Sequence, residues 1–507
     1  MTSEREVVMR TKELELWFVT GSQELYGKEV LKKVEENSKK LVDHLNNEND
    51  FPARIVWKAV LKDAEQIRRV MNEANSTDNC IGLIGWMHTF SPGKMWIGGL
   101  GSIRKPFLHL HTQFEQKIPW KTIDMDYMNT NQSAHGGREF GYIATRMGIK
   151  RKVIAGHWRD EKVLESLNNW IRATLGWYDS QNLRIARFGD NMRYVAVTEG
   201  NKVDAQIELG YEVHGYALGD LFEYISRVED YEVERLLEQY REEYSSIKGS
   251  VSDEEIRASL CEAAKVEIGV RHFLEEGNFK AFTTTFENLH GLGQLPGLAC
   301  QRLMRDGYGF GAEGDWKSAA LVRIMKMMAS GKDSGTSFIE DYVYHLEPGN
   351  TKELGAHMLE VCESIANNKP SLEVHPLSIG GKGAPARSVF TAKEGPAIQA
   401  CIVEFGDRFR MIVSEVDVVK QEEDMPSLPV ARALWIPRPD LATAATAWIF
   451  SGGAHHSCLS YSVSVEQMED LCEIIGMELV VIDSNTEIRN LKRELRNNEI
   501  YYKLKNI

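Results

Sequence analysis

The sequence predicts an α/β protein with a doubly wound N-terminal domain, a second α/β domain and a mainly β C-terminal domain. Compact apolar runs alternate with amphipathic helical segments through the first third of the chain, and the alternation resumes near Arg184. After about Gly331 the pattern changes to short β-rich runs separated by Gly and Pro. With 507 residues the chain exceeds the size at which a single hydrophobic core stops growing. We therefore expect domains at 1–183, 184–333 and 334–507.

The N-terminal domain shows the strand–helix rhythm most clearly. Strands that alternate with helices in this way predict a parallel sheet, in which ligands collect at the carboxyl ends of the strands. Segments 21–23 and 86–89 lie at such ends and are candidates for a pocket. We predict strands at 14–19, 53–61, 80–86, 106–110 and 153–155, and helices beginning near Lys28 and spanning 63–74.

The central and C-terminal domains are predicted from local signals. Ser252 stands three residues before Glu255, the spacing of a capping box, and opens a long helix that reaches Gly277. Further central elements are predicted as strands at 184–188, 194–198 and 279–286, and helices at 296–305 and 316–330. In the C-terminal domain we predict strands at 338–344, 358–361, 400–405, 409–416 and 479–482, with helices near the end.

The composition narrows the class of function. Hydrophobic residues make up 43% and charged residues 26%, as in ordinary globular proteins. A net charge of −14 spread along the chain argues against nucleic acid as a partner. Since no apolar run approaches the roughly 20 residues needed to span a bilayer and no secretory signal is visible, we expect no membrane association and a cytoplasmic location. The seven scattered cysteines, without a C-x-x-C pair, fit reduced and mostly buried thiols.

One small device recurs three times, namely a Gly-Ala pair followed by a group that can hold a metal. The third residues are Glu313, His357 and His455. His456 follows directly after the last of them, and Glu340 lies between the first two. Small residues let the backbone approach a ligand closely. Because carboxylates combined with imidazoles form a mixed oxygen and nitrogen site, the pattern indicates a divalent ion such as Mn²⁺.

Each of these groups also has a purely structural interpretation. Glu313 could be a carboxylate that stabilises the start of the following helix, with Asp315 as the N-cap. The glycines around Glu313 favour a site instead, because a helix cap needs no such flanks. Glu340 alone could be a solvated surface carboxylate. The adjacent His455 and His456 are more informative, and since neighbours on a strand point to opposite faces, we expect one of the two to reach the site.

The polar tract at 131–139 contains a Gly-Gly pair between His135 and Arg138. Its structural interpretation is a turn before a helix. Its functional interpretation is a loop that presents both side chains to a polar ligand. The glycine-containing stretches match neither the dinucleotide-binding pattern nor the P-loop pattern, so a nucleotide site is not predicted.

Many stretches, taken together and in order, resemble the L-arabinose isomerase family. The stretches that carry the resemblance are 17–27, 87–92, 133–141, 187–193, 283–287, 313–317 and 452–456. The resemblance covers nearly the whole chain, and so many motifs in one order do not arise by chance. It implies a fucose-isomerase-like architecture and a metal-dependent aldose–ketose isomerase that interconverts L-arabinose and L-ribulose through an enediol. Conversion of D-galactose to D-tagatose is a further activity that it suggests.

The resemblance also implies a set of metal ligands. They carry over to Glu313, Glu340, His357 and His456, and the expected ion is Mn²⁺, with Co²⁺ or Mg²⁺ as alternatives. The recurrent Gly-Ala device points to His455, whereas the family motif points to His456, and we follow the family motif. The family usually has Phe-Ala-Gly before the first glutamate, while residues 310–312 read Phe-Gly-Ala here, which places a methyl beside the ligand.

Catalytic and substrate-binding roles follow from the same resemblance. Glu313 and Glu340 are the expected acid and base, although metal ligation lowers carboxylate basicity. His135 is expected to assist proton transfer at O1 or ring opening, and to come from a neighbouring subunit of a homotrimer or homohexamer. The positions that match sugar-lining residues are Gln23, Met192 and Phe286.

Three other functions fit part of the sequence. An isomerase of a related sugar, such as L-fucose or D-galactose, would use the same metal with a different pocket. A non-catalytic sugar-binding protein would share the doubly wound first domain, but the intact ligand set argues against it. A metal-dependent hydrolase would need a scissile substrate, which nothing in the sequence indicates.

Overall fold

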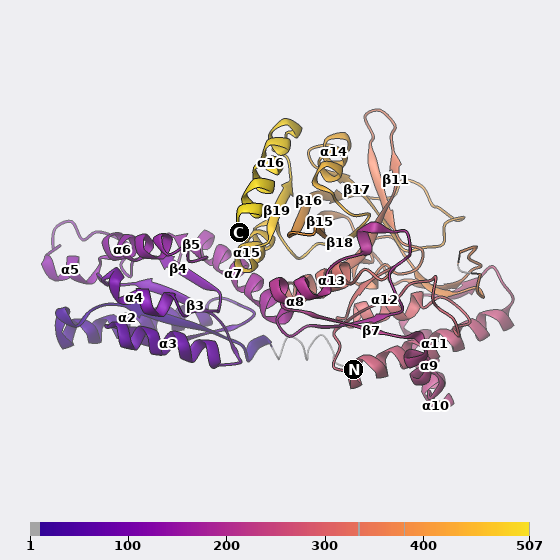
Figure 1. Cartoon of the computed structure of the whole chain (residues 1–507), viewed down its shortest axis with the longest axis horizontal. Coiled ribbons are helices and arrows are strands. Elements are labelled where there is room, and N and C mark those ends of the chain that lie inside the picture. Colours follow the sequence, from indigo (N-terminus) through magenta and orange to yellow (C-terminus); the bar gives the residue numbers. More distant parts are fainter. Residues whose placement is uncertain (1–10, 333–334, 380, 506–507) are drawn as a thin grey trace. The chain divides into compact units, whose positions relative to one another are not determined.

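The computed structural model describes residues 11–332, 335–379 and 381–505 (Figure 1). It confirms an α/β protein in which two parallel sheets precede a largely antiparallel C-terminal sheet. Contacts divide the chain into two compact units, one ending at Tyr178 and the other beginning at Asp179, and each is described by itself. No helix in the described part of the chain is long and apolar enough to cross a membrane.

The N-terminal unit contains a five-stranded parallel sheet of order β2-β1-β3-β4-β5. All five predicted strands are present, and the central strand β3 is buried along its whole length, as expected where helices cover both faces. The strands are β1 (Glu15–Gly21), β2 (Arg54–Leu61), β3 (Cys80–Met87), β4 (Phe107–His111) and β5 (Lys152–Ala155).

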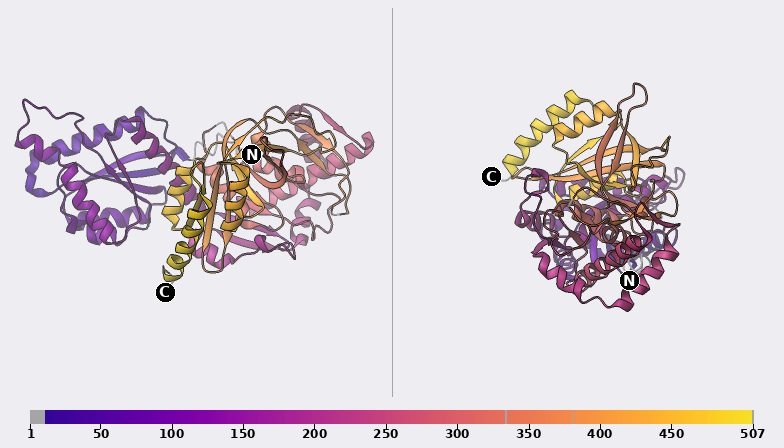
Figure 2. Two further views of the ribbon diagram at one scale, coloured as in Figure 1. Left: turned by 90° about the horizontal axis from the view of Figure 1, so that it is seen from above. Right: turned by 90° about the vertical axis from the view of Figure 1, so that its right-hand side faces the viewer.

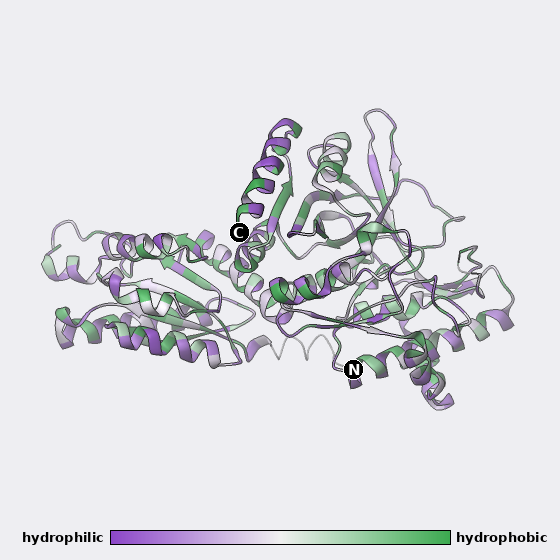
Figure 3. Ribbon diagram, in the orientation of Figure 1, coloured by the Kyte–Doolittle hydropathy of each residue, from purple (hydrophilic) through white to green (hydrophobic). Residues whose placement is uncertain are grey.

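Helices lie on both faces of this sheet, which confirms the doubly wound prediction. One face forms a core with α3 (Ala64–Ser76), α4 (Gly93–Leu100) and α6 (Ser133–Arg146). Val19 belongs to that core, so the adjacent Thr20 faces the other side, where its hydroxyl donates to Ser38 of α2 at 2.9 Å. Hydrophilic and hydrophobic residues alternate along α2 as on an amphipathic helix (Figure 3). The remaining helices of this unit are α2 (Gly27–Asn47), α5 (Met125–Thr130) and α7 (Glu161–Ser180).

The second unit opens with another parallel sheet, of order β10-β9-β6-β7. One prediction here is wrong: segment 194–198 is not a strand, and its last residues form a 3-10 turn (Ala196–Thr198). The strand that pairs with β6 at the edge of the sheet is β7 instead. β7 lies at the sheet edge and carries polar residues and a glycine, so its sequence lacks the apolar run of a buried strand. The strands are β6 (Arg184–Phe188), β7 (Glu212–Tyr216), β9 (Ala281–Thr283) and β10 (Gly309–Gly311).

The predicted central helices are present. In the long helix α11 (Asp253–Glu276) the capping box is confirmed, since Ser252 Oγ accepts from the Glu255 N–H at 3.3 Å and Glu255 Oε2 accepts from the Ser252 N–H at 2.9 Å. The other helices are α8 (Lys202–Leu209), α9 (Leu218–Ser226), α10 (Asp230–Glu243), α12 (Gly297–Arg305) and α13 (Trp316–Met328).

The C-terminal sheet has the order β15-β18-β11-β12-β17-β16-β19, and a further pairing of β15 with β16 closes six of these strands into a ring. The prediction of a strand at 358–361 is wrong. The strand of this region is β12, which lies just before that segment and contains Lys and Glu, so its sequence lacks the apolar pattern of a strand. The strands are β11 (Thr336–His345), β12 (Lys352–Ala356), β15 (Gly395–Glu404), β16 (Phe409–Val418), β17 (Arg432–Pro437), β18 (His456–Ser460) and β19 (Glu478–Ile482).

The predicted late helices pack on this sheet (Figure 2). Trp448 of α14 (Leu441–Ser451) and Leu491 of α16 (Ile488–Lys505) share a core with residues of β15, β16 and β19. A third helix is α15 (Val465–Ile475). All seven cysteines are free thiols and all but Cys261 are buried, as predicted.

The central and C-terminal parts share a small sheet. β8 (Ile247–Gly249) pairs in parallel with β13 (Ser371–Val374), which pairs with β14 (Ala386–Val389). A common core also joins these strands to α10, α11 and α12, which explains why the two parts form one compact unit. The boundary expected at 333/334 lies outside the described residues.

Candidate metal centre

Glu313 is held in a tight turn between β10 and α13. Its φ of 59° lies in the left-handed region, which is rare for a residue other than glycine and is often found at functional sites. The surrounding glycines allow close backbone contacts: a Cβ at Gly311 would lie 2.3 Å from the Asp315 carbonyl oxygen, and one at Gly314 would lie 2.6 Å from the Asn191 Cα. The methyl of Ala312 is buried beside Glu313. The glycines around Glu313 thus permit the tight turn that positions its carboxylate.

Glu340 and two histidines are brought together by strand register. Glu340 on β11 pairs with His456 on β18 and, on its other side, with Ala356 at the end of β12. His357 follows Ala356 directly. Since paired residues on neighbouring strands carry their side chains on the same face, the register places Glu340 beside His456.

The side chains of these residues form a compact cluster. His456 Nε2 lies 3.7 Å from Glu313 Oε2, and His357 Nε2 lies 3.7 Å from Glu340 Oε2. Two sets of donor atoms lie within 4.8 Å of one another, one from Glu313, His357 and His456 and the other from Glu340, His455 and His456. Carboxylate oxygens and imidazole nitrogens converging at this separation can hold a divalent cation.

Each buried histidine of the cluster is oriented by a carboxylate behind it. His456 Nδ1 lies 3.1 Å from Asp315 Oδ2, and His357 Nδ1 lies 2.5 Å from Glu360 Oε2. Nε2 of His456 is buried with no hydrogen-bond partner among the described residues. Histidines that ligate metals commonly donate their other ring N–H to a carboxylate in this way. The donor set and the unpartnered nitrogen therefore fit a divalent metal.

The electrostatics of the cluster favour a cation. Burial opposes ionisation of Glu313, but the neighbouring imidazoles, first His455 and then His456 and His357, outweigh it and lower the pKa of Glu313. Burial likewise opposes ionisation of Asp315, yet Lys317 and His456 lower its pKa to about 2. Although burial disfavours the charged form of His357, nearby carboxylates, Glu360 first, raise its pKa. Glu313 and Asp315 are therefore held in the ionised form, which is the form that attracts a cation.

Both members of the histidine pair approach the cluster, against the expectation that only one would. β18 begins at His456, so His455 lies outside the strand and does not follow its alternation. His455 Nε2 is 3.8 Å from Glu313 Oε2 and 4.0 Å from Glu340 Oε1. The two histidines differ in exposure, because the His455 side chain is 36% exposed and that of His456 is fully buried.

Two of the predicted sugar-lining residues flank the Glu313 turn. The Met192 N–H donates to the Glu313 carbonyl oxygen at 3.1 Å. Phe286 is half-buried two residues after Thr284, whose carbonyl oxygen accepts from the Gly314 N–H at 3.1 Å. Both loops therefore contact the turn that carries Glu313.

Gln23 and His135 belong to the N-terminal unit, at the predicted edge of its sheet. Gln23 lies two residues after the end of β1, and the adjacent Ser22 hydroxyl accepts from Thr89 at 2.7 Å beyond the end of β3. His135 is exposed and stacks on Phe90 with 4.5 Å between ring centroids. The hydrogen bond between Ser22 and Thr89 thus joins the segments that follow β1 and β3, which were predicted to form a pocket.

The tract around His135 forms the first turn of α6, which agrees with the structural interpretation of a helix N-terminus, although its Gly-Gly pair lies inside the helix. Its two glycines are needed for close packing: a Cβ at Gly136 would lie 2.5 Å from the Thr89 carbonyl oxygen, and one at Gly137 would lie 2.3 Å from His111 Nδ1.

Sequence reasoning missed the supporting residues. Asp315 was expected only as the N-cap of α13, which it is, since it accepts from the Lys317 and Ser318 N–H groups. No short sequence motif predicts the contact between Asp315 and His456. Glu360 stands three residues after His357, a spacing that could have drawn attention to it. Tyr342 is another missed group, and burial together with the charges of Glu340, Glu360 and Glu313 raises the pKa of its phenol.

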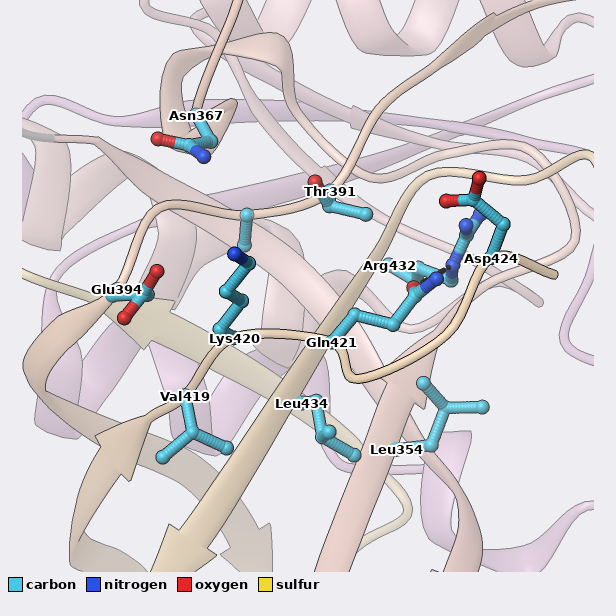
Figure 4. A pocket seen from close by; sticks show the side chains of 11 residues that line it. Leu354, Asn367, Thr391, Glu394, Val419, Lys420, Gln421, Asp424, Arg432 and Leu434 are labelled. Atoms are coloured by element: carbon cyan, nitrogen blue, oxygen red, sulfur yellow. Dashed lines mark hydrogen bonds between the residues drawn. The ribbon is translucent and has the colours of Figure 1, made fainter.

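A cavity of about 170 Å³ lies elsewhere on the C-terminal sheet (Figure 4). Val419 and Leu434 line its apolar side, and Glu394, Lys420 and Arg432 supply charges of both signs. None of the predicted site residues lines it, and it is separate from the metal cluster.

Comparison with known proteins agrees with this arrangement. Residues 10–182, 184–331 and 335–478 match the N-terminal, central and C-terminal domains of L-arabinose isomerase. The chain belongs to the L-arabinose isomerase family. The L-arabinose isomerase of Geobacillus stearothermophilus is 58% identical to it over 489 residues, which cover 96% of this chain and 98% of the relative. Those of Herpetosiphon aurantiacus and Thermotoga neapolitana are 56% and 55% identical over 97% of the chain, covering 98% and 99% of the relatives.

Membership of the L-arabinose isomerase family makes this chain a sugar isomerase, and therefore an enzyme that acts on a small-molecule sugar. The cluster around Glu313 and Glu340 lies in the central and C-terminal matches, and Gln23 and His135 lie in the N-terminal match.

Proposed function

We propose that this enzyme interconverts L-arabinose and L-ribulose with a divalent metal held by Glu313, Glu340, His357 and His456. The observation that carries the proposal is the convergence of these four side chains, with Asp315 and Glu360 behind the two imidazoles. The full-length likeness to L-arabinose isomerases supports the choice of substrate. Mn²⁺ suits the mixed ligand set best, and Co²⁺ or Mg²⁺ could replace it.

The reaction moves a proton between C2 and C1 of the sugar while the carbonyl changes place. The proton beside a carbonyl is too weakly acidic to leave unaided at neutral pH, so a base must lie on one side and an acid on the other. When bound, a divalent cation supplies Lewis acidity and holds the reacting oxygens in position. Glu313 and Glu340 come from separate elements, β10–α13 and β11, and are the acid and base. Each contributes roughly 10²–10⁴-fold, and the intermediate is an enediol.

The remaining roles concern binding. Met192 and Phe286 lie on loops against the Glu313 turn and offer apolar contact to the sugar. Gln23 supplies a polar contact, and His135, contributed by a neighbouring subunit of a homotrimer or homohexamer, assists ring opening or proton transfer at O1. D-Galactose, which converts to D-tagatose by the same proton transfer, is a second substrate. We place the domain boundaries after residues 183 and 333.

The test is ketose formation from L-arabinose by EDTA-treated protein, with and without added Mn²⁺, compared with Glu313→Gln and Glu340→Gln. Glu347→Gln, an exposed carboxylate beyond the same strand β11, is the matched control. We expect Mn²⁺-dependent L-ribulose formation that each site variant lowers at least about 10²-fold and that the control retains. A metal-loaded, folded enzyme that binds the sugar but forms no ketose would contradict the proposal for this substrate.

A further inference from the structure

A second pocket lies in the central part of the chain, away from the metal cluster. It is formed by the end of β7, by α9 and by the last turn of α11, and has a volume of about 390 Å³. No residue of the proposed active site lines it. Its lining combines four aromatic rings with three carboxylates, namely Tyr216, Tyr224, Phe273 and Phe279 with Asp220, Glu223 and Glu276.

The aromatic rings are fixed against one another. Phe273 meets Tyr216 and Tyr224 edge-on, with centroids 4.9 Å and 5.0 Å apart. Phe279 stacks beside Phe273 at 5.9 Å and meets Tyr216 edge-on at 5.7 Å. Phe273 and Phe279 are buried, whereas Tyr216 and Tyr224 are partly exposed at the pocket mouth. Mutual packing therefore holds a rigid aromatic wall that remains reachable from solvent.

The charges at this pocket have one sign. The carboxylates of Asp220, Glu223 and Glu276 are exposed, and no Lys or Arg lines the pocket. Each carboxylate also has a local neighbour: Asp220 accepts from the Ala217 N–H at 3.0 Å, Glu223 pairs with Arg227 at 3.0 Å, and Glu276 lies beside the Tyr224 phenol and helps to raise its pKa. These contacts hold the carboxylates at the rim. Arg227 offsets the charge of Glu223, so the negative charge that remains in the lining comes from Asp220 and Glu276.

The end of α11 brings a further carboxylate to this pocket. The carboxyl end of a helix carries a partial negative charge and normally attracts basic residues. α11 instead ends on Glu276, which lines the pocket, and its last turn contains no basic residue. The Arg184 guanidinium of β6 donates to the carbonyl oxygen of the C-cap Gly277 at 2.6 Å, so a cation from another element caps this helix end.

Neighbouring cations show that these rings accept positive charge. The Arg184 guanidinium carbon lies 4.8 Å from the centroid of Phe279, and that of Arg227 lies 5.7 Å from Tyr224. Neither arginine lines the pocket. The cavity on the C-terminal sheet differs in this respect, because it carries charges of both signs and no aromatic ring (Figure 4).

We propose that this aromatic and acidic pocket binds a small organic cation of the alkylammonium class. Ring faces attract an ammonium group through their negative electrostatic potential, and the carboxylates of the lining add Coulombic attraction. A neutral ligand of the same shape gains only the apolar contact. Binding here is independent of the isomerase reaction.

The experiment is a calorimetric titration of the full-length enzyme in sodium phosphate with choline and, in parallel, with 3,3-dimethylbutan-1-ol, in which carbon replaces the charged nitrogen. Tyr224→Leu removes a partly exposed ring of the lining and Glu276→Gln removes one charge. Tyr231→Leu, an exposed aromatic on α10, and Glu275→Gln, the neighbouring carboxylate outside the lining, are the matched controls. Circular dichroism and the isomerase rate establish that each variant is folded.

We expect choline to bind at least about tenfold more tightly than its neutral analogue. Tyr224→Leu and Glu276→Gln should each weaken choline binding several-fold, while the two control variants retain it. The proposal is overturned if choline and the neutral alcohol bind equally, if choline does not bind, or if the control variants weaken binding as much as the pocket variants. Since Glu276→Gln removes no packing, it remains informative if Tyr224→Leu fails to fold.

Discussion

The Asp315 carboxylate lies 3.1 Å from Nδ1 of His456, although 141 residues separate the two in the chain. The same carboxylate caps α13 by accepting from the Lys317 and Ser318 N–H groups. One side chain therefore fixes both the start of a helix in the central part and the orientation of an imidazole in the C-terminal sheet. With Nδ1 engaged, Nε2 of His456 is directed at Glu313.

This relationship predicts the effect of Asp315→Asn. Asparagine is as good an N-cap as aspartate, so α13 should persist. Loss of the charge behind His456 should lower Mn²⁺ affinity about 10–100-fold, with activity partly restored at high Mn²⁺. Calorimetric Mn²⁺ titration of the EDTA-treated protein measures this. Asp440→Asn, which changes the N-cap of α14, is the matched control and should leave the affinity unchanged. Equal losses in both variants would show that capping, not imidazole orientation, is responsible.

Metal removal should lower thermal stability as well as activity. Four carboxylates, Glu313, Glu340, Asp315 and Glu360, meet the histidines of the cluster, and a bound cation relieves their repulsion. At a Mn²⁺ concentration 100 times the dissociation constant, binding stabilises the folded state by about 2.7 kcal/mol. Differential scanning calorimetry with EDTA or Mn²⁺ should show a higher Tm with metal. The double variant Glu313→Gln/His357→Asn should lose this rise, and an undiminished rise would place the stabilising metal elsewhere.

The sequence predicted the residues of the cluster better than the residues that orient them. The Gly-Ala device and the family resemblance pointed to Glu313, Glu340 and His357, which the structure brings into one cluster, since residue type and close backbone approach are local properties. The contact between Asp315 and His456 depends on how α13 meets β18, and no short segment encodes it. His455 approaches the carboxylates because β18 begins one residue later, a boundary that sequence reasoning does not fix.

The same distinction applies to the fold. The buried strand β3 carries a continuous apolar run, and this run is sufficient to predict it from the sequence. β7 and β12 contain charged residues and a glycine, so periodicity alone did not reveal them. The ring closure between β15 and β16 is a long-range pairing that follows from the whole sheet.

Phe286→Ala should affect sugar binding more than chemistry. The ring is half-buried on a loop that contacts the Glu313 turn, so its loss removes apolar contact with the substrate but no ligand or acid–base group. We expect KM for L-arabinose to rise about tenfold with a smaller change in kcat. Steady-state kinetics with L-arabinose and D-galactose measures both parameters. Phe222→Ala, an exposed aromatic on α9, is the control. A lower kcat with unchanged KM would instead place Phe286 in transition-state positioning.

A pair of buried carboxylates lies in the C-terminal sheet near the cluster. Burial, reinforced by Glu353, raises the pKa of Asp341 well above its usual value, and burial raises the pKa of Glu353 to about 7. Because the folded-state pKa of Glu353 exceeds the unfolded value, the folded protein binds its proton more tightly. Stability is therefore greatest below the unfolded pKa and falls as pH rises towards 7, by up to about 3 kcal/mol for Glu353.

Glu353→Gln should remove this loss of stability. Glutamine keeps an oxygen to accept from Trp435 Nε1, which lies 3.2 Å from Glu353 Oε2. The variant should therefore have a higher Tm than the parent at pH 8, and the difference should shrink towards zero at pH 5, where Glu353 is protonated in the folded protein. Calorimetric scans across this range test the expectation, with the exposed Glu423→Gln as control. A variant less stable than the parent at pH 8 would mean that ionised Glu353 stabilises the sheet through its hydrogen bond to Trp435.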